Sequence, residues 1–160
     1  MAIKVGDRVP NATFTVMTGE GPKPKSSDEI FKGKKVVLFA VPGAFTPTCH
    51  KNHLPGFVKN AGAIRSKGVD TIAVTGVNDV FVMDAWKKAS GADAIDFLAD
   101  GSGNFAKALG LTADLTERGL GVRSQRYAMV VDDGVVKALN VEDAPGKAEV
   151  SGADNLMKSL

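Results

Sequence analysis

The side chain with the clearest chemical potential is Cys49, the only cysteine among 160 residues. It lies three residues after Thr46, which is itself followed by Pro47. A threonine N-cap and a proline at the first helical position are typical of a helix start. The spacing therefore predicts that Thr46 is the N-cap and that Cys49 lies in the first helical turn.

This position favours the reactive form of a cysteine. Peptide N–H groups in a first helical turn have no acceptor within the helix and carry partial positive charge, so they stabilise an anion. The thiolate is the nucleophilic form of cysteine. A buried, unreactive cysteine is the plainer alternative, but the start of a capped helix favours the reactive interpretation. Because a helix end alone supplies only part of the stabilisation, we expect a cationic side chain near Cys49.

Two histidines close to Cys49 suggest other chemistries. His53 lies one helical turn after Cys49, so the two could form the nucleophile pair of a hydrolase, and His50 could join them in holding a metal ion. His50 points about 100° away from Cys49 on a helix, and the chain has no second cysteine. We therefore expect neither a metal site nor a hydrolase, and expect His53 to pack or hydrogen-bond beneath the loop.

Residues 42–49, PGAFTPTC, resemble the peroxidatic loop of the peroxiredoxins, in which a proline, three residues, a threonine or serine and two residues precede the cysteine. Residues 53–57, HLPGF, resemble the type II (peroxiredoxin five) subfamily in particular. Three further blocks match in order along the chain: GVND at 76–79, FLADG at 97–101 and RYAMVV at 126–131. The resemblance covers essentially the whole chain.

The resemblance implies four catalytic residues: Cys49 as the nucleophile, Thr46, Pro42 and Arg126. A guanidinium beside the thiolate would stabilise it and orient a peroxide oxygen, whereas the plainer alternative for Arg126 is an ion pair with a surface carboxylate. The Thr46 hydroxyl could cap the helix or, as the resemblance implies, bond to the peroxide and the sulfur. Pro42 would limit the access of water.

Other groups near the loop are assigned more weakly. Backbone N–H groups around Ala44 and Cys49 could donate to a developing oxyanion. Arg118 and Arg123 have no support from the family pattern, so we interpret them as surface charges.

Apolar runs of strand length predict three buried strands, at residues 34–41, 69–77 and 95–99. Helical patterns follow each strand, and Pro55-Gly56 is expected to kink or break the cysteine-bearing helix before residues 57–67. The other two helices are expected at residues 79–90 and 104–109. In the helix at 79–90, the side chains expected to face inward are Phe81, Val82, Ala85 and Trp86.

The remaining segments complete the prediction. They are a strand at 12–17, a turn at 19–25, a helical turn from residue 26 to about residue 33, a polar segment at 112–125, a hairpin at 127–140, a linker at 142–151 and a closing helix at 153–160. Alternating strands and helices followed by a hairpin predict an α/β protein with a central mixed sheet and flanking helices. The resemblance implies the same architecture, a thioredoxin-like fold, and we expect one domain over residues 1–160.

Charge, apolar runs and the cysteine count exclude several classes of function and indicate a compartment. The net charge is +2, from 20 basic and 18 acidic residues, which gives no electrostatic case for binding nucleic acid. No apolar run is long enough to span a membrane and residues 1–10 lack a signal-peptide pattern. A chain with one cysteine suits a reducing compartment, so we expect a cytoplasmic protein. The GSGNF segment at 101–105 lacks the third glycine of a dinucleotide site, and no cofactor is expected.

The resulting hypothesis is a thiol-dependent peroxidase that reduces hydrogen peroxide and small organic hydroperoxides through a sulfenic acid at Cys49. With no second cysteine, regeneration requires an external thiol, either glutathione with glutaredoxin or thioredoxin. The resemblance also implies a homodimer, with Phe45 and residues 79–86 as candidate contacts. The alternative is a non-catalytic thioredoxin-fold module that acts as a redox sensor or an interaction partner.

Overall fold

The computed structural model describes residues 2–160, and Met1, the first residue of the predicted domain, lies outside the described residues. Its centre is a seven-stranded sheet in the order β2-β1-β5-β4-β3-β8-β9. Strands β3, β4 and β5 run parallel, and the other pairings are antiparallel. The predicted mixed sheet is therefore confirmed. The strands of this sheet are β1 Thr13–Thr18, β2 Gly21–Ser26, β3 Lys35–Val41, β4 Thr71–Gly76, β5 Asp96–Ala99, β8 Tyr127–Asp132 and β9 Val135–Val141.

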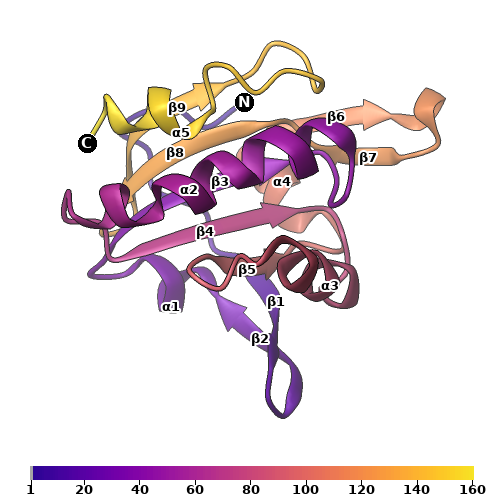
Figure 1. Ribbon diagram of the computed structural model, residues 1–160, viewed down its shortest axis with the longest axis horizontal. Coiled ribbons are helices and arrows are strands. Elements are labelled where there is room, and N and C mark those ends of the chain that lie inside the picture. The colour runs from indigo at the N-terminus through magenta and orange to yellow at the C-terminus, as the bar shows by residue number, and fades with distance from the viewer. Residues whose placement is uncertain (1) are drawn as a thin grey trace.

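Helices cover both faces of the sheet (Figure 1). One face is covered by α2 Leu54–Arg65, α3 Val80–Ser90 and α5 Ala153–Met157. The other is covered by α1 Ser27–Phe31 and α4 Asn104–Leu109. Strand β3 is buried on both sides, as its continuous apolar sequence predicts. This is the thioredoxin-like arrangement expected from the sequence, with the carboxyl end of the central strand leading directly to Cys49.

Two segments expected to be irregular form strands instead. Residues 19–25 were predicted as a turn, but residues 21–26 form the edge strand β2 beside β1. Its two prolines, Pro22 and Pro24, are two residues apart on an edge strand, where alternate N–H groups face away from the sheet and need no acceptor. Residues 112–125 contain a small antiparallel ribbon of β6 Thr112–Leu115 and β7 Gly121–Ser124, joined by the short helix η2 Thr116–Arg118.

Helix α3 buries a face that matches the predicted one only in part. Trp86 is fully buried and Val82 packs partly buried against the core, as expected, but Ala85 is exposed. Asp79 is its N-cap and its carboxylate accepts from the Val82 N–H at 2.9 Å, so the helix starts one residue later than predicted. The residues that it buries are Val80, Met83 and Trp86. Phe81 was expected to face inward but is 65% exposed. Hydrophobicity alone did not determine the rotation of this helix, because apolar side chains lie on more than one of its sides.

The helix that carries Cys49 is not broken at Pro55-Gly56. It begins at Pro47, passes through the π-helical turn η1 Cys49–His53 and continues without interruption as α2. In the π turn the Leu54 N–H bonds to the Cys49 carbonyl, five residues back. Pro55 has no N–H to donate and its ring would crowd the carbonyl four residues earlier. The wider turn just before it absorbs this misfit, so the helix is locally distorted there but the predicted break is wrong.

None of the helices formed by residues 2–160 is long and apolar enough to cross a membrane. The closing helix α5 is shorter than predicted and ends at Met157, while Leu160 still packs partly buried against the core.

Candidate active site

Cys49 lies at the carboxyl end of β3, in the first turn of the helix, as predicted. Its side chain is fully buried, with a relative exposure of 0%. The Thr46 carbonyl accepts the His50 N–H at 2.8 Å and Pro47 is the first helical residue, so Thr46 is the backbone N-cap. The Cys49 N–H has no acceptor among residues 2–160. Its partial positive charge therefore remains available beside the sulfur.

The Thr46 hydroxyl serves the sulfur rather than the helix end. Its Oγ1 lies 3.0 Å from the Cys49 Sγ and 2.6 Å from the Gly43 carbonyl oxygen. It accepts no backbone N–H of the first turn. The sequence left two roles open for this hydroxyl, capping the helix and contacting the sulfur. In the structure it contacts the sulfur.

Arg126 supplies the cationic partner. Its side chain is 2% exposed, and its Nη2 donates to the Cys49 Sγ at 2.9 Å. Its Nε and Nη2 also donate to the Pro145 carbonyl, at 3.2 and 3.0 Å. Within residues 2–160 the guanidinium pairs with no carboxylate, so the alternative of a surface ion pair is wrong.

His53 is a buried neutral imidazole beneath Arg126. Its Nδ1 accepts from Arg126 Nη1 at 3.0 Å, so its Nε2 carries the proton and donates to the Ser151 carbonyl at 2.9 Å. Burial, followed by the positive charge of Arg126, lowers the pKa of His53 to about 3. His53 makes no hydrogen bond to Cys49, so the two do not form a nucleophile pair, and it hydrogen-bonds beneath the loop as predicted.

This neutral histidine should make the protein sensitive to acid. Below its ordinary pKa of 6.5 an unfolded His53 takes up a proton that the folded one refuses until about pH 3. The free energy of unfolding should therefore fall between pH 6.5 and pH 3, by about 1.4 kcal/mol per pH unit from this residue. Urea unfolding of wild type and His53→Gln at pH 7, 6 and 5 measures the contribution. Parallel pH profiles for the two proteins would contradict it.

The other histidine has a different partner. His50 Nδ1 accepts from the indole Nε1 of Trp86 at 3.1 Å, and its ring lies 5.7 Å from that of Phe45. His50 and His53 are thus held by separate groups. Among residues 2–160 no three His, Cys, Asp or Glu side chains are arranged to hold a metal ion.

Residues 142–151, predicted only as a linker, form a strap over the site. Glu142 is the first residue of the strap, and its N–H donates to the Arg126 carbonyl at 2.9 Å. Its carboxylate accepts from the Ser151 N–H and hydroxyl at 2.7 and 2.6 Å. The Thr48 hydroxyl donates to the Gly146 carbonyl at 3.0 Å. The strap therefore closes on itself and covers the guanidinium that contacts the sulfur.

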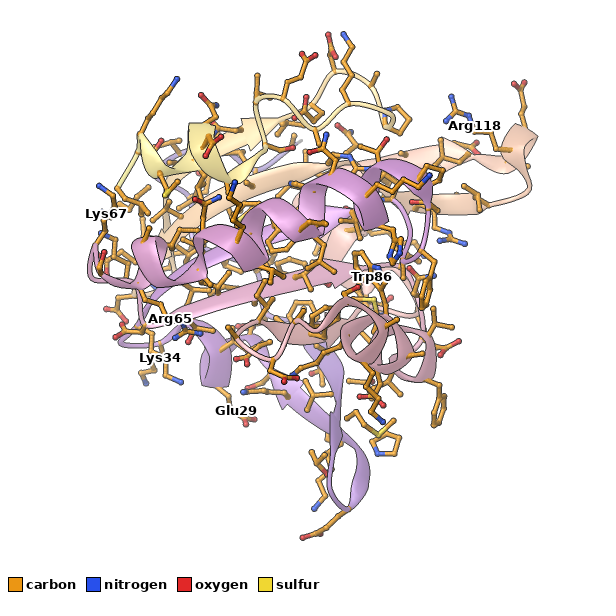
Figure 2. The ribbon with its side chains drawn as sticks, in the orientation of Figure 1. Glu29, Lys34, Arg65, Lys67, Trp86 and Arg118 are labelled. Atoms are coloured by element: carbon orange, nitrogen blue, oxygen red, sulfur yellow. The ribbon has the colours of Figure 1, made fainter. Side chains whose placement is uncertain are left out.

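Two expectations for the loop are wrong. The Ala44 N–H is not free to hold an oxyanion, because it donates to Asn78 Oδ1 at 2.9 Å. Arg123 is not a surface charge, because its Nη1 donates to the carbonyl of the buried Pro42 at 3.2 Å. Arg118, by contrast, points away from the protein near the tip of the β6–β7 ribbon (Figure 2).

Comparisons with known proteins agree with this arrangement. A protein-family model described as Redoxin matches residues 4–157. The chloroplastic Peroxiredoxin-2E of Arabidopsis thaliana is 49% identical over 165 residues, which cover 99% of this chain and 70% of the relative. Peroxiredoxin-2C of Oryza sativa subsp. japonica is 46% identical over 160 residues, covering 99% and 98%. The chain belongs to the redoxin family and is a peroxiredoxin.

A solved structure supports the same conclusion. The crystal structure of reduced Prx3 from Vibrio vulnificus in complex with H₂O₂ superposes with a TM-score of 0.94 at 53% identity and covers 98% of each chain. These 160 residues include a single cysteine, and the chain therefore has the one-cysteine, type II form that the motifs predicted. It is therefore a thiol-dependent peroxidase rather than the non-catalytic module of the alternative hypothesis.

Proposed function

We propose that Cys49 is the peroxidatic nucleophile and that Arg126, Thr46 and Pro42 form its catalytic environment. The observation that carries this assignment is that a fully buried sulfur has two donors, Arg126 Nη2 at 2.9 Å and Thr46 Oγ1 at 3.0 Å. Hydrogen bonds that involve a charged group are about twice as strong as neutral ones, and burial strengthens them further. The arrangement thus favours a thiolate where no water competes for it.

The proposed reaction is the attack of the Cys49 thiolate on a hydroperoxide. The thiolate attacks the terminal oxygen of a hydroperoxide, the S–O bond forms as the O–O bond breaks, and the leaving alkoxide or hydroxide takes a proton to give an alcohol or water. Sulfur is oxidised to a sulfenic acid and the peroxide is reduced by two electrons. The Arg126 guanidinium, which cannot lose its proton, and the unpaired Cys49 N–H are the donors positioned to stabilise the developing negative charge.

Thr46 has one hydroxyl proton and two acceptors within reach. In the thiol form it donates to the Gly43 carbonyl, and in the thiolate form it turns its proton to the sulfur. Pro42 is buried beside this group and excludes water from it.

We further propose that an external thiol closes the cycle. Among the 160 residues only Cys49 bears a thiol, so the sulfenic acid has no partner thiol within them. The thiol attacks the sulfenic sulfur, a mixed disulfide forms and water leaves, and a second thiol then releases the Cys49 thiolate. Glutathione with glutaredoxin, or thioredoxin directly, is the proposed reductant. Because Cys49 is 0% exposed, such a thiol reaches it only when the turn around residues 47–53 opens.

Mass spectrometry after one equivalent of peroxide tests the cycle. The reduced chain should gain the mass of one oxygen and then convert to a glutathione adduct when glutathione is added, whereas Cys49→Ser should show neither change. Coupled assays with thioredoxin, with glutaredoxin plus glutathione and with glutathione alone identify the reductant. A Cys49–Cys49 disulfide as the dominant and kinetically competent product would contradict the proposal.

A homodimer that forms beside the active site is the proposed assembly. Phe45 is 46% exposed and Phe81 is 65% exposed. Phe45 lies 6.5 Å from Trp86 between ring centroids, so this exposed side chain lies beside α3, the helix that carries Phe81. Sedimentation at tens of micromolar should give a dimer, and Phe81→Ser should shift it toward monomer. A wild-type chain that sediments only as monomer would exclude this assembly.

The proposed location is the cytoplasm, which the single cysteine supports because it suits a reducing compartment. Relatives include chloroplastic and mitochondrial proteins, so cell fractionation is the deciding measurement.

A further inference from the structure

The loop formed by residues 42–46 has a backbone conformation that must be stabilised by residues outside the loop. Phe45 has a φ of 64°, in the left-handed region that bulky side chains rarely adopt. Its side chain is half exposed, so burial does not hold it there. A strained backbone of this kind persists only where the surrounding structure determines it.

One external support comes from Asn78, in the turn between β4 and α3. Its side-chain oxygen accepts the Ala44 N–H at 2.9 Å. Gly76, two residues earlier, brings this turn close to the loop, because a Cβ there would lie 3.1 Å from the Val41 carbonyl oxygen. Asn78 can therefore reach the loop only because β3 and β4 end in close contact.

A second support comes from the other side of the site. Arg123 on β7 donates through Nε to the Leu120 carbonyl at 2.8 Å and through Nη1 to the Pro42 carbonyl at 3.2 Å. It thereby links the β6–β7 ribbon to the loop. Gly43 allows this approach, because a Cβ at that position would lie 3.0 Å from Arg123 Nη1 and 2.9 Å from a Thr46 carbon.

The two supports enclose the residue that holds the Thr46 hydroxyl. Pro42 is bound through its carbonyl and Ala44 through its N–H, and Gly43 lies between them with its carbonyl 2.6 Å from Thr46 Oγ1. The Thr46 hydroxyl is in turn 3.0 Å from the Cys49 sulfur. Any displacement of residues 42–44 is thus transmitted to the hydroxyl.

We propose that Asn78 and Arg123 are positioning residues of the peroxidase reaction, which clamp residues 42–44 so that the Thr46 hydroxyl is held against the Cys49 sulfur. This inference rests on the proposed roles of Thr46 and Cys49. It assigns a function to an arginine on the protruding ribbon and to an asparagine outside the peroxidatic loop, neither of which touches the sulfur.

The experiment compares two reactions of the same sulfur. Oxidation by hydrogen peroxide requires the aligned hydroxyl, whereas alkylation by iodoacetamide requires only a reactive and accessible thiolate. Asn78→Ala and Arg123→Met should each slow oxidation by about 5- to 10-fold, as expected for one lost hydrogen bond, and should slow alkylation much less, because Arg126 still donates to the sulfur. The ratio of the two rate constants should therefore fall at least threefold. Arg118→Met removes the same charge from the exposed tip of the ribbon and should leave the ratio unchanged.

Two further variants test whether the effect comes from the hydrogen bonds to residues 42–44 rather than from the charge of Arg123. Arg123→Lys keeps the charge but loses the forked donor that spans Leu120 and Pro42, so it should lower the ratio as Arg123→Met does, and it replaces that variant if the methionine form does not fold. Because both residues hold the same segment, the double variant should lose less than the product of the single losses.

The outcomes distinguish this inference from the function on which it rests. If the ratio is unchanged in Asn78→Ala and Arg123→Lys while Thr46→Val still lowers it, the clamp is wrong and the proposed site stands. If Thr46→Val also leaves it unchanged, the role of Thr46 fails and the clamp fails with it.

Discussion

Replacement of Arg126 by methionine should slow the oxidation of Cys49 by hydrogen peroxide by about 30-fold or more. The substitution removes a buried guanidinium that donates to the sulfur at 2.9 Å and leaves a side chain of similar length. Loss of one partner from a buried, charge-assisted pair costs about 2–5 kcal/mol, and each 1.4 kcal/mol is a factor of ten in rate. Stopped-flow measurement of thiol loss under excess peroxide gives the rate constant of the variant and of the wild type.

The chain provides a matched control for this change. Arg118→Met makes the same substitution at an exposed position and should retain the wild-type rate (Figure 2). Circular dichroism should confirm that Arg126→Met still folds, because the substitution also leaves His53 Nδ1 and the Pro145 carbonyl without their donor. A folded Arg126→Met variant that reacts with peroxide at the wild-type rate would remove Arg126 from the mechanism.

Replacement of Thr46 by valine should slow the same reaction by about 10- to 100-fold. Valine has nearly the shape of threonine, so the change isolates the hydroxyl that lies 3.0 Å from the sulfur and 2.6 Å from the Gly43 carbonyl. A hydrogen bond to a charged group contributes about 1.5–3 kcal/mol. Stopped-flow measurement of thiol loss under excess peroxide gives the second-order rate constant directly.

Thr46→Ser is the informative companion variant, because it keeps the hydroxyl and loses only a methyl group. Most of the lost rate should return in it. If serine and valine are equally slow, the methyl group rather than the hydroxyl is responsible, and the proposed movement of the proton between Gly43 and Cys49 is wrong.

Much of the scaffold could be predicted because its signals are local. Strand β3 is a continuous apolar run, and a fully buried strand needs nothing else to define it. The helix start at Thr46 and Pro47 is likewise encoded by adjacent residues, and the structure has it there. The family motifs identified Arg126 as the partner of Cys49, although the pattern of residues near position 126 gives no indication of it.

Predictions from local sequence were wrong where tertiary packing overrides the local preference of a residue. Pro55 predicts a helix break in isolation, yet tertiary packing keeps Leu54 and Phe57 fully buried on one continuous helix and a π turn absorbs the misfit. In α3 the Asp79 cap and the core together selected the buried face, so Phe81 points outward although its hydrophobicity predicts the reverse.

The sequence by itself indicated the sulfur that is the proposed nucleophile and the element on which it lies, because Cys49 is the one cysteine among the 160 residues and follows a central strand at a helix start. The family motifs named Thr46, Pro42 and Arg126, but only the tertiary structure showed how they and Arg123, Asn78 and His53 are arranged around that sulfur. Arg126 is 77 residues from Cys49 and Arg123 is 81 residues from Pro42. Each pair meets only because β3 and β7 end, and β8 begins, in the same part of the fold. Contacts of this length depend on the full packing of the sheet, which no local pattern specifies.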